Sequence, residues 1–112
     1  MQKGRPTRWH SNQQEKHIAK SLNGRQVANS GAAHFVGGDV TTELFLIEAK
    51  TVTKEQRSFT IKKEWIEKNR EEAIAMGKSY NALAFDFGDG RQHYVIDEKL
   101  FKQLVEYLES VN

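Results

Sequence analysis

The chain has 112 residues, of which 38% are hydrophobic and 29% are charged, a composition typical of one globular domain with one core. It contains no cysteine, which excludes disulfides, thiol nucleophiles and cysteine zinc sites and fits a reducing cytoplasm. No stretch approaches the roughly 18 apolar residues of a membrane span, and the N-terminus has no apolar segment typical of a signal peptide. We therefore expect a cytoplasmic protein that does not interact with a membrane.

The net charge of +2 is unevenly distributed along the chain. Residues 1–38 contain six basic residues and one acidic residue, a balance of +5, which leaves −3 for the remainder. A basic end on a near-neutral body is typical of a protein that binds a polyanion; the alternative is a disordered tail that only aids solubility. Residues 1–10 include the chain's proline and lack periodicity, so the sequence predicts a flexible basic arm over 1–10 and one domain over 11–112.

The first predicted helix begins at Ser11, because Ser11 and Gln14 match a capping box. It should end near Leu22, where the following Asn-Gly pair favours a left-handed C-terminus. Glu15 lies on the apolar stripe of this helix, which predicts an inward carboxylate. The alternative is a first-turn glutamate that favours the helix dipole and keeps its carboxylate in water.

A short strand within Arg25–Asn29 and two further strands should follow this helix. The second contains Asp39, and the third contains the apolar run Leu44–Ile47 and ends in Glu48–Lys50. Four consecutive apolar residues between turn signals indicate a strand that is buried on both faces. Because side chains alternate along a strand, Glu48 and Lys50 point to the same side. Asp39 and Glu48 should then lie on adjacent antiparallel strands, close enough to share one ion.

Acidic groups at the end of a buried strand are costly, because a low-dielectric site strongly disfavours isolated charges. A bound divalent cation would remove this cost, and carboxylate oxygens are the ligands that Mg²⁺ prefers. Lys50 would then face the same anion as the metal, and we expect this anion to be a phosphate. The alternatives are that Glu48 and Lys50 form an ion pair on a solvated strand edge, and that Asp39 only serves a turn.

The second half of the chain predicts a helix, a hairpin and a final helix. The helix runs from Lys62 to Met76, the hairpin strands cover Asn81–Phe87 and Gln92–Ile96, and Asp97 caps the last helix. The predicted order is α-β-β-β-α-β-β-α. Helices flank the strands in this order, so we expect an α/β fold with a mixed central sheet covered on both faces.

The spacing of Asp39 and Glu48-Ala49-Lys50 resembles the D…(D/E)-x-K signature of the PD-(D/E)XK nuclease superfamily. The basic N-terminus, the helical Glu15 and the Ser30-Gly31 turn are similar to those of small archaeal and phage Holliday-junction resolvases. The resemblance covers roughly residues 11–87. Gly38 departs from the pattern, because the signature's name has a proline there, although that position varies widely in the superfamily.

The resemblance implies a restriction-endonuclease-like core and a Mg²⁺-dependent endonuclease, with Mn²⁺ able to substitute. It implies that Asp39, Glu48 and the Ala49 carbonyl bind the metal, and that Glu15 binds it directly or through water. Lys50 would orient the nucleophilic water and neutralise charge in the transition state. Ser30 would hydrogen-bond a phosphate near the metal.

The expected partner is branched double-stranded DNA. Two groups of basic residues are candidates for phosphate contacts: those of the N-terminal half and those that follow the signature. The alternative is that their charges are only solvated at the surface. They are Lys3, Arg5, Arg8, Arg25, Lys54, Arg57 and Lys62. A junction has two equivalent scissile phosphates, so we expect a two-fold homodimer, with an interface near the hairpin and the last helix. A nickase, a mismatch or restriction-type nuclease and a non-catalytic nucleic-acid-binding module are the alternatives.

Overall fold

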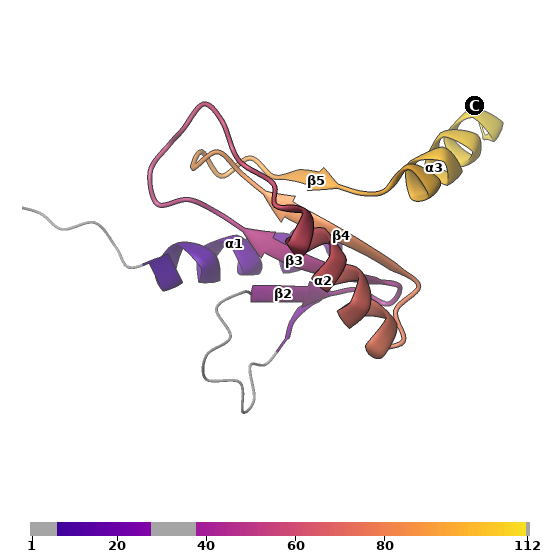
Figure 1. Cartoon of the computed structure of the whole chain (residues 1–112), viewed down its shortest axis with the longest axis horizontal. Coiled ribbons are helices and arrows are strands. Elements are labelled where there is room, and N and C mark those ends of the chain that lie inside the picture. Colours follow the sequence, from indigo (N-terminus) through magenta and orange to yellow (C-terminus); the bar gives the residue numbers. More distant parts are fainter. Residues whose placement is uncertain (1–6, 28–37, 112) are drawn as a thin grey trace, which may run out of the picture.

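The structure is a computed structural model that describes residues 7–27 and 38–111 (Figure 1). Three helices and one mixed sheet of five strands make up the described chain, in the predicted element order. The α/β class and the mixed sheet are therefore confirmed. The elements are α1 (Thr7–Leu22), β1 (Arg25–Gln26), β2 (Gly38–Thr41), β3 (Phe45–Lys50), α2 (Lys63–Ala75), β4 (Tyr80–Phe85), β5 (His93–Val95) and α3 (Glu98–Ser110).

The strands lie side by side in sequence order, β1-β2-β3-β4-β5. β3 and β4 are parallel and are joined through α2, whereas the other neighbouring pairs are antiparallel. A parallel pair needs a long crossover, and α2 supplies it. In the β2–β3 pair, Asp39 stands opposite Glu48, so the predicted antiparallel juxtaposition of these two acids is confirmed.

The two faces of the sheet are covered by different helices. On one face, Ile18 of α1 packs in a buried cluster with side chains of β2, β3 and β4 that include Val40 and Ile47. Side chains alternate along β3, so Leu46 and Glu48 point to the opposite face, where α2 lies. The central strand is buried on both faces, as its apolar run predicts.

The N-terminal boundary differs from the prediction. α1 begins at Thr7, so Ser11 lies inside the helix and is not its N-cap, and Arg8 belongs to a helix and not to an arm. The physical reason is that no glycine or proline stands between Thr7 and Ser11 to stop the helix from extending past the capping-box pattern. The C-terminus is as predicted: Asn23 has φ 55°, and the Gly24 N–H donates to the Ala19 carbonyl over 2.7 Å.

α3 begins as predicted, because the Asp97 carboxylate accepts a hydrogen bond of 2.8 Å from the Leu100 N–H. It does not flank the sheet, however. Figure 1 shows it projecting from the body beyond β5, and Leu100 is its one buried residue. The expectation that helices cover the sheet therefore holds for α1 and α2 but is wrong for α3.

Within the described ranges, no helix combines the length and the apolar character needed to cross a membrane.

Candidate metal centre

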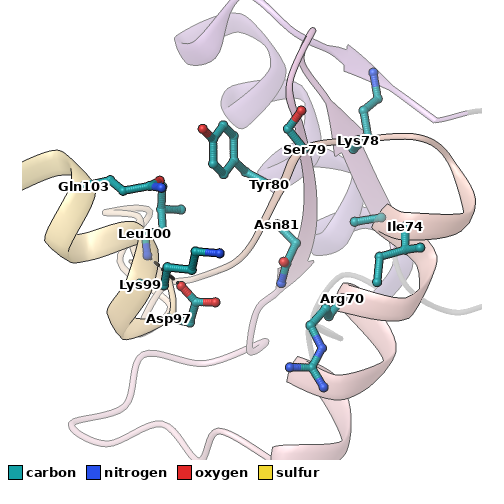
Figure 2. Close-up of a pocket in the computed structure, with 11 residues that line it drawn as sticks. Arg70, Ile74, Lys78, Ser79, Tyr80, Asn81, Asp97, Lys99, Leu100 and Gln103 are labelled. Carbon is teal, nitrogen blue, oxygen red and sulfur yellow. Dashed lines mark hydrogen bonds between the residues drawn. The ribbon is translucent and has the colours of Figure 1, made fainter.

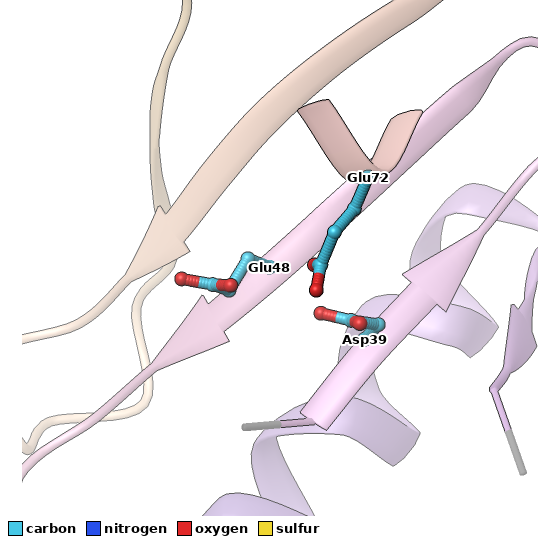
Figure 3. Close-up of side chains that lie close together, drawn as sticks. All are labelled: Asp39, Glu48 and Glu72. Carbon is cyan, nitrogen blue, oxygen red and sulfur yellow. The ribbon is translucent and has the colours of Figure 1, made fainter. Parts of the chain in front are cut away.

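Three carboxylates converge on the α2 face of the sheet (Figure 3). Asp39, Glu48 and Glu72 each offer one oxygen, and these oxygens lie within 4.8 Å of one another. Asp39 and Glu48 come from opposed positions of β2 and β3, and Glu72 comes from α2. Residues distant in sequence thus place three acids around one point.

Four of the six carboxylate oxygens of the three acids are buried and accept no hydrogen bond. Asp39 is 8% exposed and Glu48 is 1% exposed, while Glu72 is half-buried. The four oxygens are Asp39 Oδ1, both Glu48 oxygens and Glu72 Oε1. Buried polar atoms are normally paired, and unpaired carboxylate oxygens are especially unfavourable. The cluster therefore has free acceptor capacity, and one oxygen of each acid lies within 4.8 Å of the others.

The electrostatics of the cluster oppose ionisation when no cation is present. Burial first, and then the negative charges of Glu48 and Glu72, raise the pKa of Asp39 to about 7. Burial also raises the pKa of Glu48, against the opposing effects of Lys50 and Lys68. A divalent cation would reverse both effects, because it favours the ionised form of every carboxylate that it binds.

The residues present fit a hard divalent cation. Mg²⁺ prefers oxygen ligands and is usually held by one or two carboxylates together with water, and the cluster offers three carboxylates. The described chain contains no cysteine, and no histidine belongs to the group. This donor set therefore suits a hard cation that binds oxygen, and it lacks the sulfur and imidazole ligands that softer metals select.

Lys50 lies beside this cluster. Its Nζ is 3.6 Å from Glu48 Oε2, which confirms that the two side chains share a face of β3. The same Nζ lies 4.5 Å from the centroid of the Trp65 ring, which supports the lysine from α2. On the backbone, Gln14 Nε2 of α1 donates to the Lys50 carbonyl over 2.7 Å. Both ends of Lys50 are thus positioned by neighbouring helices.

A second lysine approaches the cluster from α2. Lys68 Nζ lies 3.8 Å from Glu72 Oε2, and its charge lowers the pKa of both Asp39 and Glu48. Lys68 and Lys50 therefore partly offset the charge of three carboxylates.

Glu15 lies outside the triad. It is half-buried on α1, and Gln26 Nε2 of β1 donates to its Oε1 over 3.3 Å. Burial raises the pKa of Glu15, while Gln26 and Arg8 oppose the shift. Its charge also contributes to the raised pKa of Asp39, so the two carboxylates are electrostatically coupled. A role for Glu15 in metal binding stays a prediction.

The other predicted site residues are placed as follows. The Ala49 side chain belongs to the core on the α1 face, so its backbone carbonyl is the one group it could offer to a metal. Ser30, Lys3 and Arg5 lie outside the described residues. The remaining cations are exposed, namely Arg8 on α1, Arg25 on β1, and Lys54, Arg57 and Lys62 between β3 and α2.

Sequence reasoning missed Glu72. The helix was predicted with Trp65 and Asn69 on its inward face, and Glu72 stands seven and three residues after them. That spacing puts Glu72 on the same face, so the signal was present. A glutamate in a helix rich in charge is usually on the surface, and only the fold brings this one to β2 and β3.

We predict that Glu72→Gln weakens Mn²⁺ binding about 10-fold, because one charged ligand is replaced by a neutral group of the same shape. The neighbouring Glu71 is exposed, so Glu71→Gln is the matched control and should leave the affinity unchanged. Calorimetric titration measures both variants. Equal affinities for the two would contradict the placement of Glu72 in the metal centre.

The raised pKa of Asp39 should make the stability of the metal-free protein depend on pH. The Asp39 pKa of about 7 in the folded chain exceeds its ordinary value of 3.8, so this group contributes most stability below about pH 4. That contribution, up to about 4 kcal/mol, is lost as pH rises through about 7. We predict that the metal-free protein has a lower free energy of unfolding at pH 8 than at pH 5, as measured by urea denaturation in EDTA.

Asp39→Asn is the control for this effect, because asparagine does not titrate, and the variant should show a smaller loss between the two pH values. Mg²⁺ should act in the opposite direction and stabilise the wild type more at pH 8, where the carboxylates are ionised. A wild-type stability that rises with pH in EDTA would contradict the electrostatics described above.

Comparison of the chain with family models, with curated proteins and with solved structures finds no match.

Proposed function

We propose that the chain is a metal-dependent, structure-selective endonuclease with a restriction-endonuclease-like core. Its substrate is branched double-stranded DNA, and its activity is most like that of a Holliday-junction resolvase. The observation that carries the proposal is the arrangement of Asp39, Glu48 and Lys50: two buried carboxylates opposed on antiparallel strands, with an ammonium 3.6 Å from the second. Glu72 completes a set of three acids.

The chemistry is the hydrolysis of a phosphodiester bond. A bound Mg²⁺ or Mn²⁺ would supply Lewis acidity toward the phosphate and lower the pKa of a bound water. Asp39, Glu48 and Glu72 would hold the cation, with the Ala49 carbonyl as a further ligand. Lys50 would hydrogen-bond the attacking water and stabilise the negative charge that develops on the phosphate oxygens. The low exposure of Glu48 keeps these interactions in a medium of low dielectric constant, where they are stronger.

Cations on the segment that follows Lys50 support a DNA-binding role near the same site. Lys62 Nζ lies 5.7 Å from the centroid of the Trp65 ring, the same ring that Lys50 contacts. Lys54 and Arg57 lie on the exposed segment between β3 and α2. A DNA strand with its phosphate at Lys50 would pass these side chains. Arg8 and Arg25, with Lys3 and Arg5, would extend the contact surface.

We predict that the double variant Lys54→Gln and Arg57→Gln binds a four-way junction more weakly and with a smaller salt dependence. Each lost phosphate contact lowers the slope of log K against log salt by roughly 0.9, so two contacts lower it by about 1.8. The matched double replacement of Lys99 and Lys102 on α3 should leave the slope unchanged. An unaltered slope in the first variant would exclude this segment from the DNA interface.

The proposal includes a two-fold homodimer. A four-way junction presents two equivalent scissile phosphates, and the described part of the chain has one acidic cluster, which offers one site. A C2 pair of chains would place two sites on matching strands in a single encounter.

The test compares a four-way junction, a linear duplex of the same sequence and a single strand, each with Mg²⁺ and with EDTA. We expect paired cuts in the junction with Mg²⁺, slower or no cutting of the other substrates, and no cutting in EDTA. Equal cutting of duplex and junction would favour a restriction-type nuclease, and single cuts would favour a nickase. A wild-type protein that binds the junction but never cuts it with Mg²⁺ or Mn²⁺ would overturn the enzyme assignment and favour a non-catalytic binding module.

A further inference from the structure

Lys68 of α2 lies at the edge of the acidic cluster. Its Nζ is 3.8 Å from Glu72 Oε2, whereas Glu72 Oε1 is buried and accepts no hydrogen bond. Glu72 therefore has one oxygen beside the Lys68 ammonium and another that is unpaired, and its carboxylate reaches toward those of Asp39 and Glu48 (Figure 3). The Lys68 ammonium thus stands one carboxylate away from the point where a cation would bind.

The contact between Lys68 and Glu72 is not the pairing that best stabilises a helix. A pair at positions i and i+4 stabilises a helix more when glutamate precedes lysine, and here lysine precedes glutamate. The charge of Lys68 also lowers the pKa of Asp39 on β2 and of Glu48 on β3, so it acts on acids of two other elements. The place of Lys68 is therefore explained by the cluster and not by the stability of α2.

Lys68 and Lys50 have corresponding positions around the cluster. Each has its ammonium beside one glutamate, with Lys50 Nζ 3.6 Å from Glu48 Oε2 and Lys68 Nζ 3.8 Å from Glu72 Oε2. The Lys50 side chain is 25% exposed and the Lys68 side chain is 50% exposed, whereas Asp39 and Glu48 are buried. An anion that approaches from solvent can therefore contact both ammonium groups without first meeting the carboxylates that would repel it.

The charges of the centre are matched to one divalent cation. The three acids carry three negative charges when ionised, and the two lysines carry two positive charges. One divalent cation would leave one positive charge, which a single phosphodiester group balances, whereas a second divalent cation would leave three positive charges in a partly buried site. Glu15 does not alter this balance, because the Arg8 charge opposes its own.

We propose that Lys68 is a further catalytic residue of this centre, whose ammonium binds the scissile phosphate together with Lys50 and takes the place of a second cation. In two-metal sites the second ion supplies positive charge to the oxygens of the reacting phosphate. Lys68 would supply that charge from α2, so the centre would need one divalent cation per chain. The inference rests on the proposed function for the identity of the anion as a phosphodiester.

A neighbouring cation of α2 provides the matched control. Arg70 lines a hollow of about 280 Å³ together with Asp97 and Lys99 (Figure 2), and none of the three acids of the cluster lines that hollow. Arg70 stands two residues after Lys68, which places it on a different face of the helix. Arg70→Gln therefore removes one positive charge from the same helix and leaves the acidic cluster as it is.

The first test counts the cations by calorimetric titration at pH 8 and uses no DNA. We expect one Mn²⁺ per chain in the wild type, and at least about 3-fold tighter binding in Lys68→Gln, because a neighbouring positive charge is removed. Arg70→Gln should bind like the wild type. Two Mn²⁺ ions per chain with similar affinity in the wild type would overturn the proposal. An unchanged affinity in Lys68→Gln would also overturn it, because the ammonium would then lie too far from the cation to share its phosphate.

The second test measures the phosphate contact with dimethyl phosphate, a phosphodiester without a nucleoside. Bound Mn²⁺ is paramagnetic, so the Mn²⁺-loaded wild type should speed the phosphorus-31 relaxation of this probe. Lys68→Gln should bind the probe about 10-fold more weakly, whereas Lys68→Arg keeps the charge and should bind within a few-fold of the wild type. No relaxation effect in the wild type, or equal binding by Lys68→Gln, would overturn the phosphate contact.

The third test is the Mg²⁺ dependence of junction cleavage. We expect Lys68→Gln to cleave at least about 10-fold more slowly, a smaller loss than for a fully buried group because Lys68 is half-exposed. Below saturation, the rate should rise with the square of the Mg²⁺ concentration in this variant and with its first power in the wild type, because a second ion then replaces the ammonium. A purely structural role would lower the rate and leave the first power unchanged, and that result would overturn the proposal.

The first two tests distinguish the failure of this inference from the failure of the proposed function, because neither uses DNA. A chain that binds one Mn²⁺ and needs Lys68 to bind dimethyl phosphate, but cuts no DNA, would retain the Lys68 phosphate contact and remove the endonuclease. A chain that cuts junctions equally well with Lys68→Gln would remove the role of Lys68 and retain the endonuclease.

Discussion

Glu48→Gln and Asp39→Asn will each reduce the cleavage of branched DNA by at least about 100-fold, the usual scale for the loss of a group that stabilises the transition state. Both replacements keep the shape of the side chain and remove a negative charge that would hold the cation. Single-turnover cleavage of a four-way junction with Mg²⁺ measures the effect. Junction binding should persist in both variants, because the proposed phosphate contacts lie on other residues.

The same replacements should stabilise the metal-free protein. Glu48 is 1% exposed, and burial raises its pKa despite the opposing charge of Lys50, so glutamine removes an unfavourable buried charge at little cost in packing. Lower activity together with higher thermal stability in EDTA would distinguish a lost metal ligand from a damaged fold. Glu43→Gln, an exposed glutamate that precedes β3, is the matched control and should change neither quantity. Cleavage by Asp39→Asn within a few-fold of the wild type would contradict its assignment as a ligand.

Lys50→Ala is the second large effect that we expect, again at least about 100-fold in the rate of cleavage. Here the cause is the loss of the ammonium that orients water and offsets charge on the phosphate, whereas the three carboxylates remain. Mn²⁺ binding should therefore be retained or strengthened, because the Lys50 Nζ lies 3.6 Å from Glu48 Oε2 and its positive charge would repel a cation bound to Glu48.

Loss of cleavage with Mn²⁺ binding retained would distinguish the role of Lys50 from that of Glu48, whose replacement should weaken both. Lys102→Ala on α3 provides a control for the loss of one positive charge far from the cluster, and it should cleave like the wild type. A Lys50→Ala variant that loses Mn²⁺ binding and cleavage together would mean that Lys50 only maintains the structure of the site.

The opposition of Asp39 and Glu48 could be predicted from the sequence because it depends on local rules. A continuous apolar run predicts a central strand, a short turn requires an antiparallel neighbour, and alternation fixes which side chains share a face. These rules together place two acids and Lys50 on one side of the sheet. The ends of α1 and α3 at Asn23 and Asp97 were also predictable, since caps are local signals.

Features that depend on tertiary contacts could not be predicted in this way. Glu72 meets Asp39 and Glu48 only because the α2 crossover packs on that face of the sheet, and its sequence context is that of a surface helix. The apolar stripe of α3 predicts burial, but the sequence does not say whether the sheet or another chain covers it. The capping box at Ser11 failed because a local pattern indicates where a helix can start and does not prevent an earlier start.

The central claim is that Asp39, Glu48 and Glu72 hold a divalent cation. Its most direct test is an anomalous difference map from a crystal soaked in Mn²⁺, with Glu48→Gln crystals treated identically. We expect one peak per chain, within bonding distance of carboxylate oxygens of Asp39 and Glu48, and a weak peak or none in the variant. Saturating Mn²⁺ with no peak at this cluster in the wild type, or an equal peak in Glu48→Gln, would contradict the account.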